Sequence, residues 1–413
     1  MFSPLHSEND LFIRGKTYII LITLIYNMTD KMKLKKFTPL VFLASLGAGG
    51  IAVMPFVLMQ YTIEHGKGLI TRSQLWSEEF TGIIAGYYYS LEIIMVLFTL
   101  IHFILTIWFT INLIKWMKTD KFSELINNPL KNTAILAPLI SILMTMNLFI
   151  GPIRYFIPTL SGNFQSLFLP AMIFWSILFI LIMWTEIKLL GISFKKGFDI
   201  NEINFGWLLH PFLLSMLTVI GTGIAAMSQN FSIANTAAFM SLISGSMGLF
   251  LLLVKMVVIF KSHFSKTDLP EKQFLPSILI VIPNITLFAI SAFRLGHFLE
   301  HHHGFHLGAY FYLVIGLSFA FEIWYMLFGL SLLKDYFKNH HFNEFYITQW
   351  GFICPLVAFV VLGGFAYNVV LPSPILYGIF IFTMITVILL YFELLIKHIK
   401  CLINENTKIN CDN

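Results

Sequence analysis

The chain has 413 residues, of which 57% are hydrophobic and only 11% are charged. Soluble domains carry about a quarter charged residues, so this composition excludes a soluble globular protein and indicates a chain that crosses a membrane several times. The formal net charge is +5, but no stretch has nucleic-acid-binding character, so no nucleic-acid partner is expected.

Residues 1–36 contain one apolar run, 18–26. That run is too short to span a bilayer, which takes about 20 apolar residues. The segment is predicted to be disordered or interfacial; the alternatives are a poor signal sequence and a natural start at Met28 or Met32. A transmembrane channel domain is then expected over 37–398, followed by a cytoplasmic tail over 399–413.

Ten stretches are long and apolar enough to cross a bilayer. They are 38–60, 80–114, 132–151, 166–189, 207–228, 236–260, 275–293, 307–333, 348–369 and 374–396. The second is longer than a hydrocarbon core of ~30 Å requires at about 1.5 Å per residue, so it is expected to tilt or project. The predicted fold class is an all-α membrane protein with ten transmembrane helices.

Lysine and arginine residues predict how these spans are oriented. All but four of the 26 Lys and Arg residues fall in segments on the side of the amino terminus. The four on the opposite side are Lys67, Arg72, Arg154 and Arg294. Because cytoplasmic loops are rich in Lys and Arg, both termini are predicted to be cytoplasmic, in a plasma or inner cell membrane.

Prolines recur in the odd-numbered spans at a nearly constant interval. Going back from Pro355, the steps to Pro283, Pro211, Pro138 and Pro55 are 72, 72, 73 and 83 residues. A repeated interval indicates copies of one structural unit, so five helical hairpins are predicted. The odd-numbered spans are expected to form an inner ring around a central pore, with the even-numbered spans facing lipid.

Helix-breaking residues are the predicted pore lining, because bent backbone at bilayer depth occurs where it is packed in protein or lines a cavity. The segment 350–364 is the clearest case, with Pro355 followed by a Gly363-Gly364 pair. The full set of predicted lining residues of this kind is Pro55, Pro138, Pro211, Gly221, Gly223, Pro283 and Pro355.

The predicted odd-numbered spans contain no Asp, Glu, Lys or Arg; their titratable side chains are His210 and Cys354. An ionisable group in mid-membrane costs roughly 2.5–3.5 kcal/mol and usually marks coupling or substrate machinery. This absence argues against a proton relay through the pore. Helix amino termini and freed N–H groups still favour anions in a neutral pore.

Two carboxylates, Glu92 and Glu322, fall within even-numbered spans. One interpretation makes them proton-coupling sites. The other makes them structural, bonded to neighbouring helices or across a subunit interface, with His102 or a tyrosine as partner.

A histidine cluster follows the seventh predicted span. His297 with His301, and His302 with His306, have the i,i+4 spacing that on a helix seats Zn²⁺ or Cu²⁺. A pH-sensitive mouth and a solvated loop without function are the alternatives.

A membrane redox subunit is the remaining class, in which His102 and His210 would ligate haem or a quinone would bind among the aromatic residues. Axial histidines usually lie at matched depth on facing helices, whereas His102 is well inside its span and His210 is at a helix end. No cofactor is expected, and enzyme activity is not predicted.

Four short motifs in chain order resemble the tellurite-resistance/dicarboxylate transporter family, which includes plant slow anion channels, bacterial tellurite-resistance-type channels and fungal malate permeases. The motifs lie at Glu124–Asn132 running on to Pro138, at His210-Pro211 with Val219–Gly223, at Leu269–Pro283, and at Phe345 with Trp350–Pro355. They resemble the entries to the third, fifth, seventh and ninth helices of that family, and the resemblance covers about 37–398.

The resemblance implies a homotrimer in which each protomer has its own pore, closed by a phenylalanine on the ninth helix. The aligned position here is Cys354, so either Phe352 or Phe359 is expected to act as the gate, or the pore is less occluded. Asn128 likewise replaces the histidine of the third-helix motif.

The predicted function is therefore passive conduction of small anions such as chloride or nitrate. The alternative is a C4-dicarboxylate (malate-type) or tellurite-related transporter, with or without proton coupling. A basic residue facing the pore would favour the dicarboxylate alternative, because an arginine binds carboxylates well. The predicted odd-numbered spans contain no basic residue.

Overall fold

The computed structural model describes the chain except residues 1–36, 67, 78, 266–268, 404–409 and 413. The predicted N-terminal segment 1–36 lies outside the described residues. So do residues 404–409 and 413 of the predicted tail 399–413.

Ten helical spans of membrane-crossing length are present in the described part of the chain, which confirms the predicted fold class. The odd-numbered spans contain α2 (Phe42–Thr62), α6 (Leu136–Leu148), α10 (Leu209–Met227), α12 (Val281–His303) and α15 (Ile353–Val369). The even-numbered spans contain α4 (Gly82–Trp116), α9 (Phe168–Lys196), α11 (Phe231–Phe264), α13 (Gly308–Leu332) and α16 (Pro374–Ile403).

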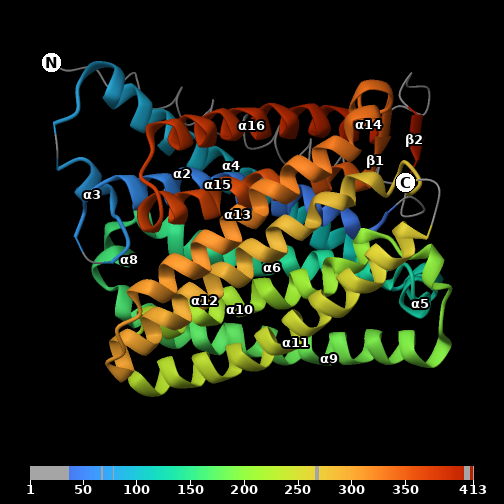
Figure 1. The fold of residues 1–413 in the computed structure, drawn as a ribbon, viewed down its shortest axis with the longest axis horizontal. Coiled ribbons are helices and arrows are strands. Elements are labelled where there is room, and N and C mark those ends of the chain that lie inside the picture. Colours follow the sequence, from blue (N-terminus) through green and yellow to red (C-terminus); the bar gives the residue numbers. More distant parts are fainter. Residues whose placement is uncertain (1–36, 67, 78, 266–268, 404–409, 413) are drawn as a thin grey trace, which may run out of the picture.

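Short elements connect the spans at the two ends of the bundle (Figure 1). At one end lie α3 (Arg72–Leu75) and α8 (Pro158–Gly162); the third span reaches this end through a π-helical turn (Phe149–Ile153) and α7 (Arg154–Phe156). At the other end lie α5 (Asp120–Asn127), α14 (Lys334–Asn339) and strand β1 (Glu344–Tyr346), which pairs in parallel with β2 (Asn410–Asp412). We call these the α3 end and the α5 end.

Burial separates the odd-numbered from the even-numbered spans. In the most apolar window of each odd-numbered span 61% to 100% of the residues are buried, against 28% to 33% in each even-numbered span. The even-numbered helices instead expose large apolar side chains, such as Ile93 and Ile107 of α4 and Ile180 of α9. An apolar outer surface on helices of this length suits contact with lipid chains.

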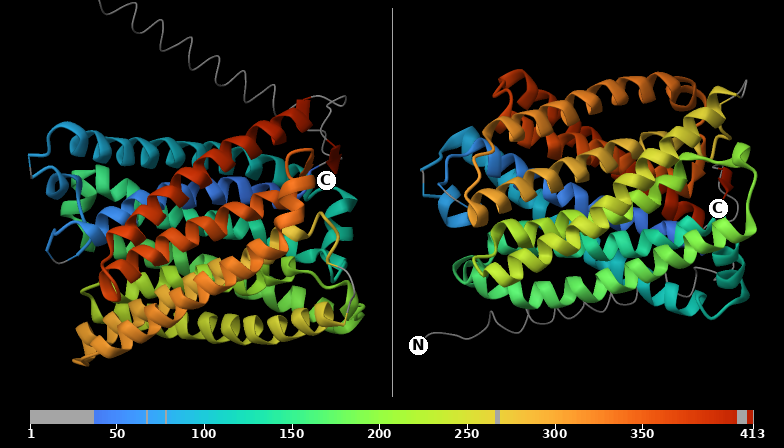
Figure 2. Two further views of the ribbon diagram at one scale, coloured as in Figure 1. Left: turned by 45° about the horizontal axis from the view of Figure 1, so that its top comes forward. Right: turned by 60° about the horizontal axis from the view of Figure 1, so that its bottom comes forward.

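Contacts among the odd-numbered helices form a closed sequence. Helix α2 contacts α6 and α15, α10 contacts α6 and α12, and α12 contacts α15. The even-numbered helices pack outside them: α4 on α2, α11 on α10, α13 on α12 and α16 on α15. Figure 2 shows the same arrangement from two further directions, with α2 enclosed by later parts of the chain.

The equally spaced prolines have a common structural position. Each of the odd-numbered spans begins with a 3₁₀ turn: Pro39–Val41, Asn132–Ile135, Phe205–Leu208, Leu275–Ile280 and Ile347–Phe352. The third residue of the α-helix that follows is Pro138, Pro211, Pro283 or Pro355 in four of the five spans. The first turn of an α-helix has no intrahelical partners for its N–H groups, so proline fits there without breaking the helix.

The expectation of mid-span kinks at these four prolines is therefore wrong, and the 72- and 73-residue intervals mark repeated helix entries. Pro55 is the exception, because it lies inside α2. The expected break at Gly363-Gly364 is also absent, since α15 is continuous from Ile353 to Val369. A Cβ at Gly364 would lie 2.7 Å from Cγ1 of Val57, so the missing side chain lets α15 approach α2 closely.

Candidate functional site

A cavity of about 140 Å³ lies between the odd-numbered spans, and we call it the central cavity. All five of these spans contribute to its wall. The lining residues are Leu46, Gly47, Gly50, Val53, Phe56, Val57, Gln60 and Tyr61 of α2; Leu69 between α2 and α3; Met144 and Asn147 of α6; Phe212, Met216 and Val219 of α10; Pro283, Thr286, Leu287, Ile290 and Arg294 of α12; and Cys354, Val357, Ala358, Val361 and Phe365 of α15.

Most of this wall is apolar. Side chains with oxygen or nitrogen are few, namely Gln60, Tyr61, Asn147, Thr286 and Arg294. Among the described residues that line the cavity, none is Asp, Glu, Lys or His. The formal charge on the wall is therefore positive, and a positive charge between low-dielectric walls attracts anions.

Arg294 lies within α12 and not beyond the membrane-spanning segment. The seventh span was predicted to end at 293, so the prediction that the odd-numbered spans carry no basic residue is wrong. Nη1 of Arg294 donates to the carbonyl oxygen of Val219 on α10 at 2.6 Å. A polar partner and an adjoining cavity stabilise the guanidinium within the helix bundle, so the helix continues past it.

A second, more polar pocket of about 480 Å³ adjoins the central cavity where α2 ends and the chain leads to α3. It is formed by residues 60–66, Gly68 and Asn368, and we call it the α2–α3 pocket. Gln60 and Tyr61 line both spaces. The Tyr61 ring lies against Phe365 of α15, with 4.4 Å between ring centroids. Tyr61 therefore lies where the two spaces meet, with Phe365 against it on the side of the central cavity.

The residues expected to act as the gate fall into two groups. Cys354 lines the central cavity, whereas Phe352 and Phe359 do not. Phe352 is 1% exposed and packs on Phe337 with 5.1 Å between ring centroids. Phe359 stacks on Phe319 of α13 at 5.4 Å. Both aromatic rings thus pack against other parts of the bundle.

Among the predicted lining prolines and glycines, Pro283 reaches the cavity wall. The predicted residues outside the lining are Pro55, Pro138, Pro211, Pro355, Gly221 and Gly223. A Cβ at Gly221 would lie 2.2 Å from Oγ of Ser241 and 2.3 Å from Cζ2 of Trp175, so this glycine faces α11 and α9. A Cβ at Gly223 would lie 3.1 Å from Nη1 of Arg294, so Gly223 contributes to the site by leaving room for the guanidinium.

Glu92 is held in a network at the α3 end. Its Oε1 accepts hydrogen bonds from Nε of Arg72 at 2.9 Å, Nε1 of Trp76 at 3.0 Å and the hydroxyl of Tyr155 at 2.9 Å. Its Oε2 accepts a bond from Nη2 of Arg72 at 3.2 Å. The bond to Glu92 raises the pKa of Arg72 above its ordinary value. These partners favour the structural interpretation, in which Glu92 joins the loop around α3 to α4 and α7.

Glu322 lies directly behind the cavity wall. It is fully buried on α13, and its Oε1 accepts a hydrogen bond from the hydroxyl of Thr286, which lines the central cavity. Its Oε2 is buried without a hydrogen-bond partner among the described residues. One side chain, that of Thr286, therefore separates Glu322 from the cavity. Glu322 lies closer to the cavity than its position on the outer helix α13 would suggest.

A buried polar cluster near the α5 end was not recognised in the sequence. Glu186 of α9 and His210 of α10 form a hydrogen-bonded pair through Nδ1 of the histidine. Lys255 of α11 donates to the carbonyl oxygen of Trp207 at 3.1 Å and lies over its ring. Lys255 lies inside the predicted span 236–260, and a Lys inside an apolar stretch is a signal of a buried partner.

The histidines of the predicted metal site have other partners. His301 bonds to the carbonyl of Ala226 at 3.2 Å, His302 to that of Ser228 at 3.0 Å, and His297 to Glu300 at 3.2 Å. In the part of the chain that the structure describes, no group of three or more His, Cys, Asp or Glu side chains is placed to hold a metal ion. The His297 and His301 rings stack with 5.8 Å between centroids, but Nδ1 of His297 bonds to Glu300 and Nδ1 of His301 to the carbonyl of Ala226, while His306 lies beyond the end of α12. The four histidines His297, His301, His302 and His306 of the predicted metal site therefore do not form one group of ligands among the described residues.

The haem alternative also fails on geometry. His102 uses Nδ1 on the carbonyl of Ser45 at 2.7 Å and Nε2 on the hydroxyl of Thr145 at 2.9 Å. Neither nitrogen is left for an iron ion.

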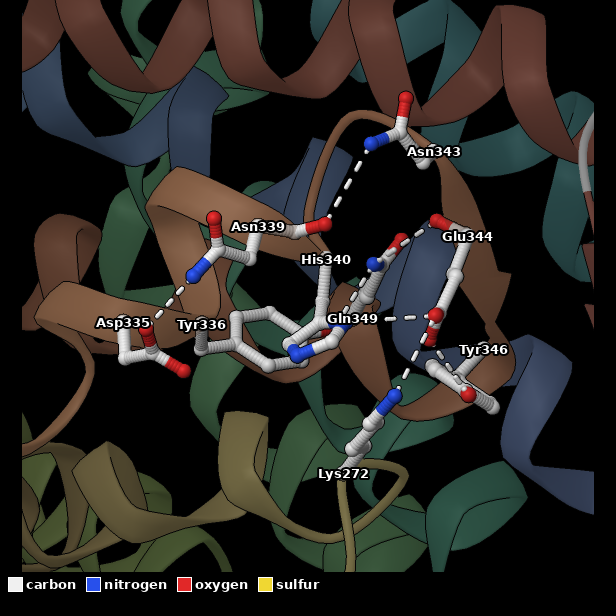
Figure 3. Close-up of polar contacts among 9 residues, drawn as sticks. All are labelled: Lys272, Asp335, Tyr336, Asn339, His340, Asn343, Glu344, Tyr346 and Gln349. Atoms are coloured by element: carbon white, nitrogen blue, oxygen red, sulfur yellow. Dashed lines mark hydrogen bonds and ion pairs between the residues drawn. The ribbon is translucent and has the colours of Figure 1, made fainter.

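A polar cluster at the α5 end fixes the entry to α15 (Figure 3). Glu344 accepts a hydrogen bond from the hydroxyl of Tyr346 at 2.7 Å and lies 3.5 Å from Nζ of Lys272. The bond from Tyr346 is the main reason that the pKa of Glu344 lies below its ordinary value. Gln349 donates to the hydroxyl of Tyr336 at 2.8 Å and to the carbonyl of Glu344 at 3.2 Å. This network connects β1 and α14 to the turn that precedes Cys354.

A family model described as a voltage-dependent anion channel matches residues 36–399. No curated protein matches the chain. The matched range contains nine of the observed spans completely and all but the last residues of the tenth. It also contains every residue that lines the central cavity.

Proposed function

Because this chain belongs to the voltage-dependent anion channel family, we propose that it passes small anions such as chloride and nitrate through the central cavity, down their electrochemical gradient. Members of this family, which is that of the tellurite-resistance/dicarboxylate transporters, are channels and transporters and not enzymes. The family membership gives the general function, anion transport by a multi-pass membrane protein. The choice of ion, the gate and the membrane are our proposals.

One observation carries the proposal. The central cavity is enclosed by the five odd-numbered spans, and the one formally charged residue on its described wall is Arg294. A fixed cation attracts anions and repels cations. The apolar remainder of the wall holds an anion only weakly, which conduction requires because the ion has to leave again.

Passive flow needs no coupling group at the wall. With a negative interior, each 100 mV drives a monovalent anion outward by about 2.3 kcal/mol. The described wall offers no carboxylate or histidine to relay a proton.

We further propose that both termini face the cytoplasm, in a plasma or inner membrane. The α5 end carries most of the lysines, as cytoplasmic loops do. Of the four residues assigned to the opposite side, Arg154 and Arg294 lie within membrane-spanning segments, which leaves that side with even fewer basic residues outside the spans. A homotrimer with one pore in each protomer is proposed from the family resemblance.

We assign the narrowest point to Tyr61 and Phe365 in place of Phe352 or Phe359. Tyr61 lines both the central cavity and the α2–α3 pocket, and Phe365 packs against it from the central cavity. At the position aligned with the family's gate, Cys354 presents only a thiol to the cavity. The aromatic constriction is thus proposed to lie toward the α3 end.

Arg294 also favours a second candidate, transport of C4-dicarboxylates such as malate. The sequence argument against it was the absence of a basic residue in the pore, and that argument no longer holds. One arginine binds one carboxylate well, whereas the described wall offers no second cation for the other carboxylate. We therefore keep dicarboxylates as the second candidate.

Purified protein in planar bilayers tests the proposal, with gradients of chloride, nitrate and malate, each without and with a pH gradient. We expect the reversal potential to follow the chloride or nitrate gradient and to be unaffected by pH. Malate movement that requires a proton gradient would reject passive conduction and make Glu322, behind Thr286, the first coupling residue to test. Absence of any anion current would reject the proposed function.

A further inference from the structure

We infer that Arg294 forms a binding site for one planar oxyanion, such as nitrate, bicarbonate or a small monocarboxylate, through the Nε–Nη2 edge of its guanidinium. The inference rests on the proposed function, because it takes the central cavity to be the anion path. It adds a chemical preference, for two coplanar oxygen atoms over a spherical halide.

The guanidinium is held in place from one side. Nη1 donates to the carbonyl of Val219 at 2.6 Å, which joins α12 to α10. A Cβ at Gly223 would lie only 3.1 Å from the same nitrogen. The hydrogen bond orients the planar group, and the missing side chain of Gly223 leaves room for Nη1; both features lie on the Nη1 side and leave the Nε–Nη2 edge unbonded among the described residues.

The Nε–Nη2 edge has no partner among the described residues. Among the described residues, the hydrogen bond that Arg294 donates is the one from Nη1, on the other edge. No described Asp or Glu forms an ion pair with Arg294. Arg294 lines the central cavity together with Tyr61 and Gln60. A guanidinium in an apolar cavity without a counter-charge favours an anion beside it.

The free edge determines which anions suit the site. Two parallel N–H donors match two oxygen atoms of a carboxylate or nitrate, and such bidentate pairs are among the strongest hydrogen-bonded contacts in proteins. Chloride has the same charge as these oxyanions, but it is a single atom and does not offer two acceptor atoms to the two parallel N–H donors. Lysine would supply the charge without the fork, which makes Arg294→Lys the informative variant.

The test measures how conductance saturates with anion concentration in bilayers, for nitrate and formate against chloride. In Arg294→Lys we expect the half-saturating concentrations of nitrate and formate to rise about tenfold, the loss of one charge-assisted hydrogen bond, while that of chloride changes much less. Arg294→Gln is expected to weaken all three. Arg154→Lys is the matched control, because Arg154 also donates to backbone carbonyls, of Ile70 at 2.6 Å and Ile150 at 3.0 Å, but does not line the cavity.

Wild-type protein supplies a measurement that does not depend on a variant folding. Formate is expected to inhibit chloride current at concentrations well below those at which bromide does. If formate and bromide inhibit alike, or if Arg294→Lys shifts nitrate and chloride equally, the bidentate site is excluded and Arg294 acts as a charge or as a tie to α10. In that case the wild type still conducts anions. If the proposed function itself is wrong, the wild type conducts no anions at all.

Discussion

At Glu92, four hydrogen bonds from three side chains converge on one carboxylate. A glutamine at this position keeps the shape but loses the charge and one acceptor oxygen. Hydrogen bonds to charged groups contribute about 1.5–3 kcal/mol each, so we expect Glu92→Gln to lower the thermal unfolding midpoint clearly. Anion current is expected to persist, because Glu92 does not line the central cavity.

Glu79→Gln is the control for this variant, since Glu79 is exposed in the same region. A Glu92→Gln protein with normal stability but a lost proton-dependent flux would restore the coupling interpretation of this residue.

His341 is the residue for which a pH dependence of stability is expected. Burial and the nearby Lys397 hold the pKa of His341 below its ordinary value of 6.5, while Glu393 acts in the opposite direction. The unfolded chain therefore binds a proton at His341 before the folded chain does, and stability falls as the pH drops below about 6.5. Above that pH the residue is neutral in both states and has no effect.

We expect the unfolding midpoint of the wild type to fall between pH 7.5 and 5.5, and His341→Gln to remove part of that fall. His303→Gln, at an exposed position at the end of α12, serves as control. The same slope in His341→Gln and wild type would assign the pH dependence to other groups.

Helix α15 contains Cys354, the residue aligned with the gate of the family. Replacing Cys354 by Phe adds an aromatic ring to a cavity of about 140 Å³. Because a hydrophobic constriction closes a pore by excluding water, we expect Cys354→Phe to reduce anion current by roughly tenfold or more, and Cys354→Ser to leave it nearly unchanged. Current that is unaffected by Cys354→Phe in a folded protein would place the anion path outside the central cavity.

The elements also show what the sequence could predict. Hydropathy located all ten spans, because lipid-facing and core-facing helices are equally apolar. Hydropathy predicts the end of the seventh span at 293, because a hydropathy profile treats an arginine as the end of an apolar stretch. The profile contains no information on the partner of Arg294, the carbonyl of Val219 on α10, which is 75 positions away in the sequence.

The side-chain directions were less predictable than the spans. The proline interval indicates a repeated unit, but it does not reveal that four of the prolines occupy first helical turns. Phe352 is close to Pro355 in the sequence, but its ring packs on Phe337 of α14, and only the packing of α14 decides that direction.

For the whole molecule, the orientation in the membrane is open to a direct test. Ser73 of α3 and Ser123 of α5 are exposed at opposite ends of the bundle (Figure 1). In a background with the native cysteines replaced by serine, we expect a membrane-impermeant maleimide to label Ser73→Cys on intact cells and Ser123→Cys only after permeabilisation. The reverse pattern would place the lysine-rich end outside and overturn the proposed orientation.

The contact between α2 and α15 has a consequence for how the protein is made. Helix α2 is the first described span, yet much of its enclosure comes from α15 and α16; the hydroxyl of Tyr391 even donates to the carbonyl of Ala44, 347 residues earlier, at 3.1 Å. A ribosome adding about 5–20 residues per second reaches α15 roughly 15–60 seconds after it has completed α2. During that time the face of α2 that later lines the cavity remains without its partner. A nascent chain released before α15 therefore has no closed wall, and we expect it to be degraded and not to form a leaky pore.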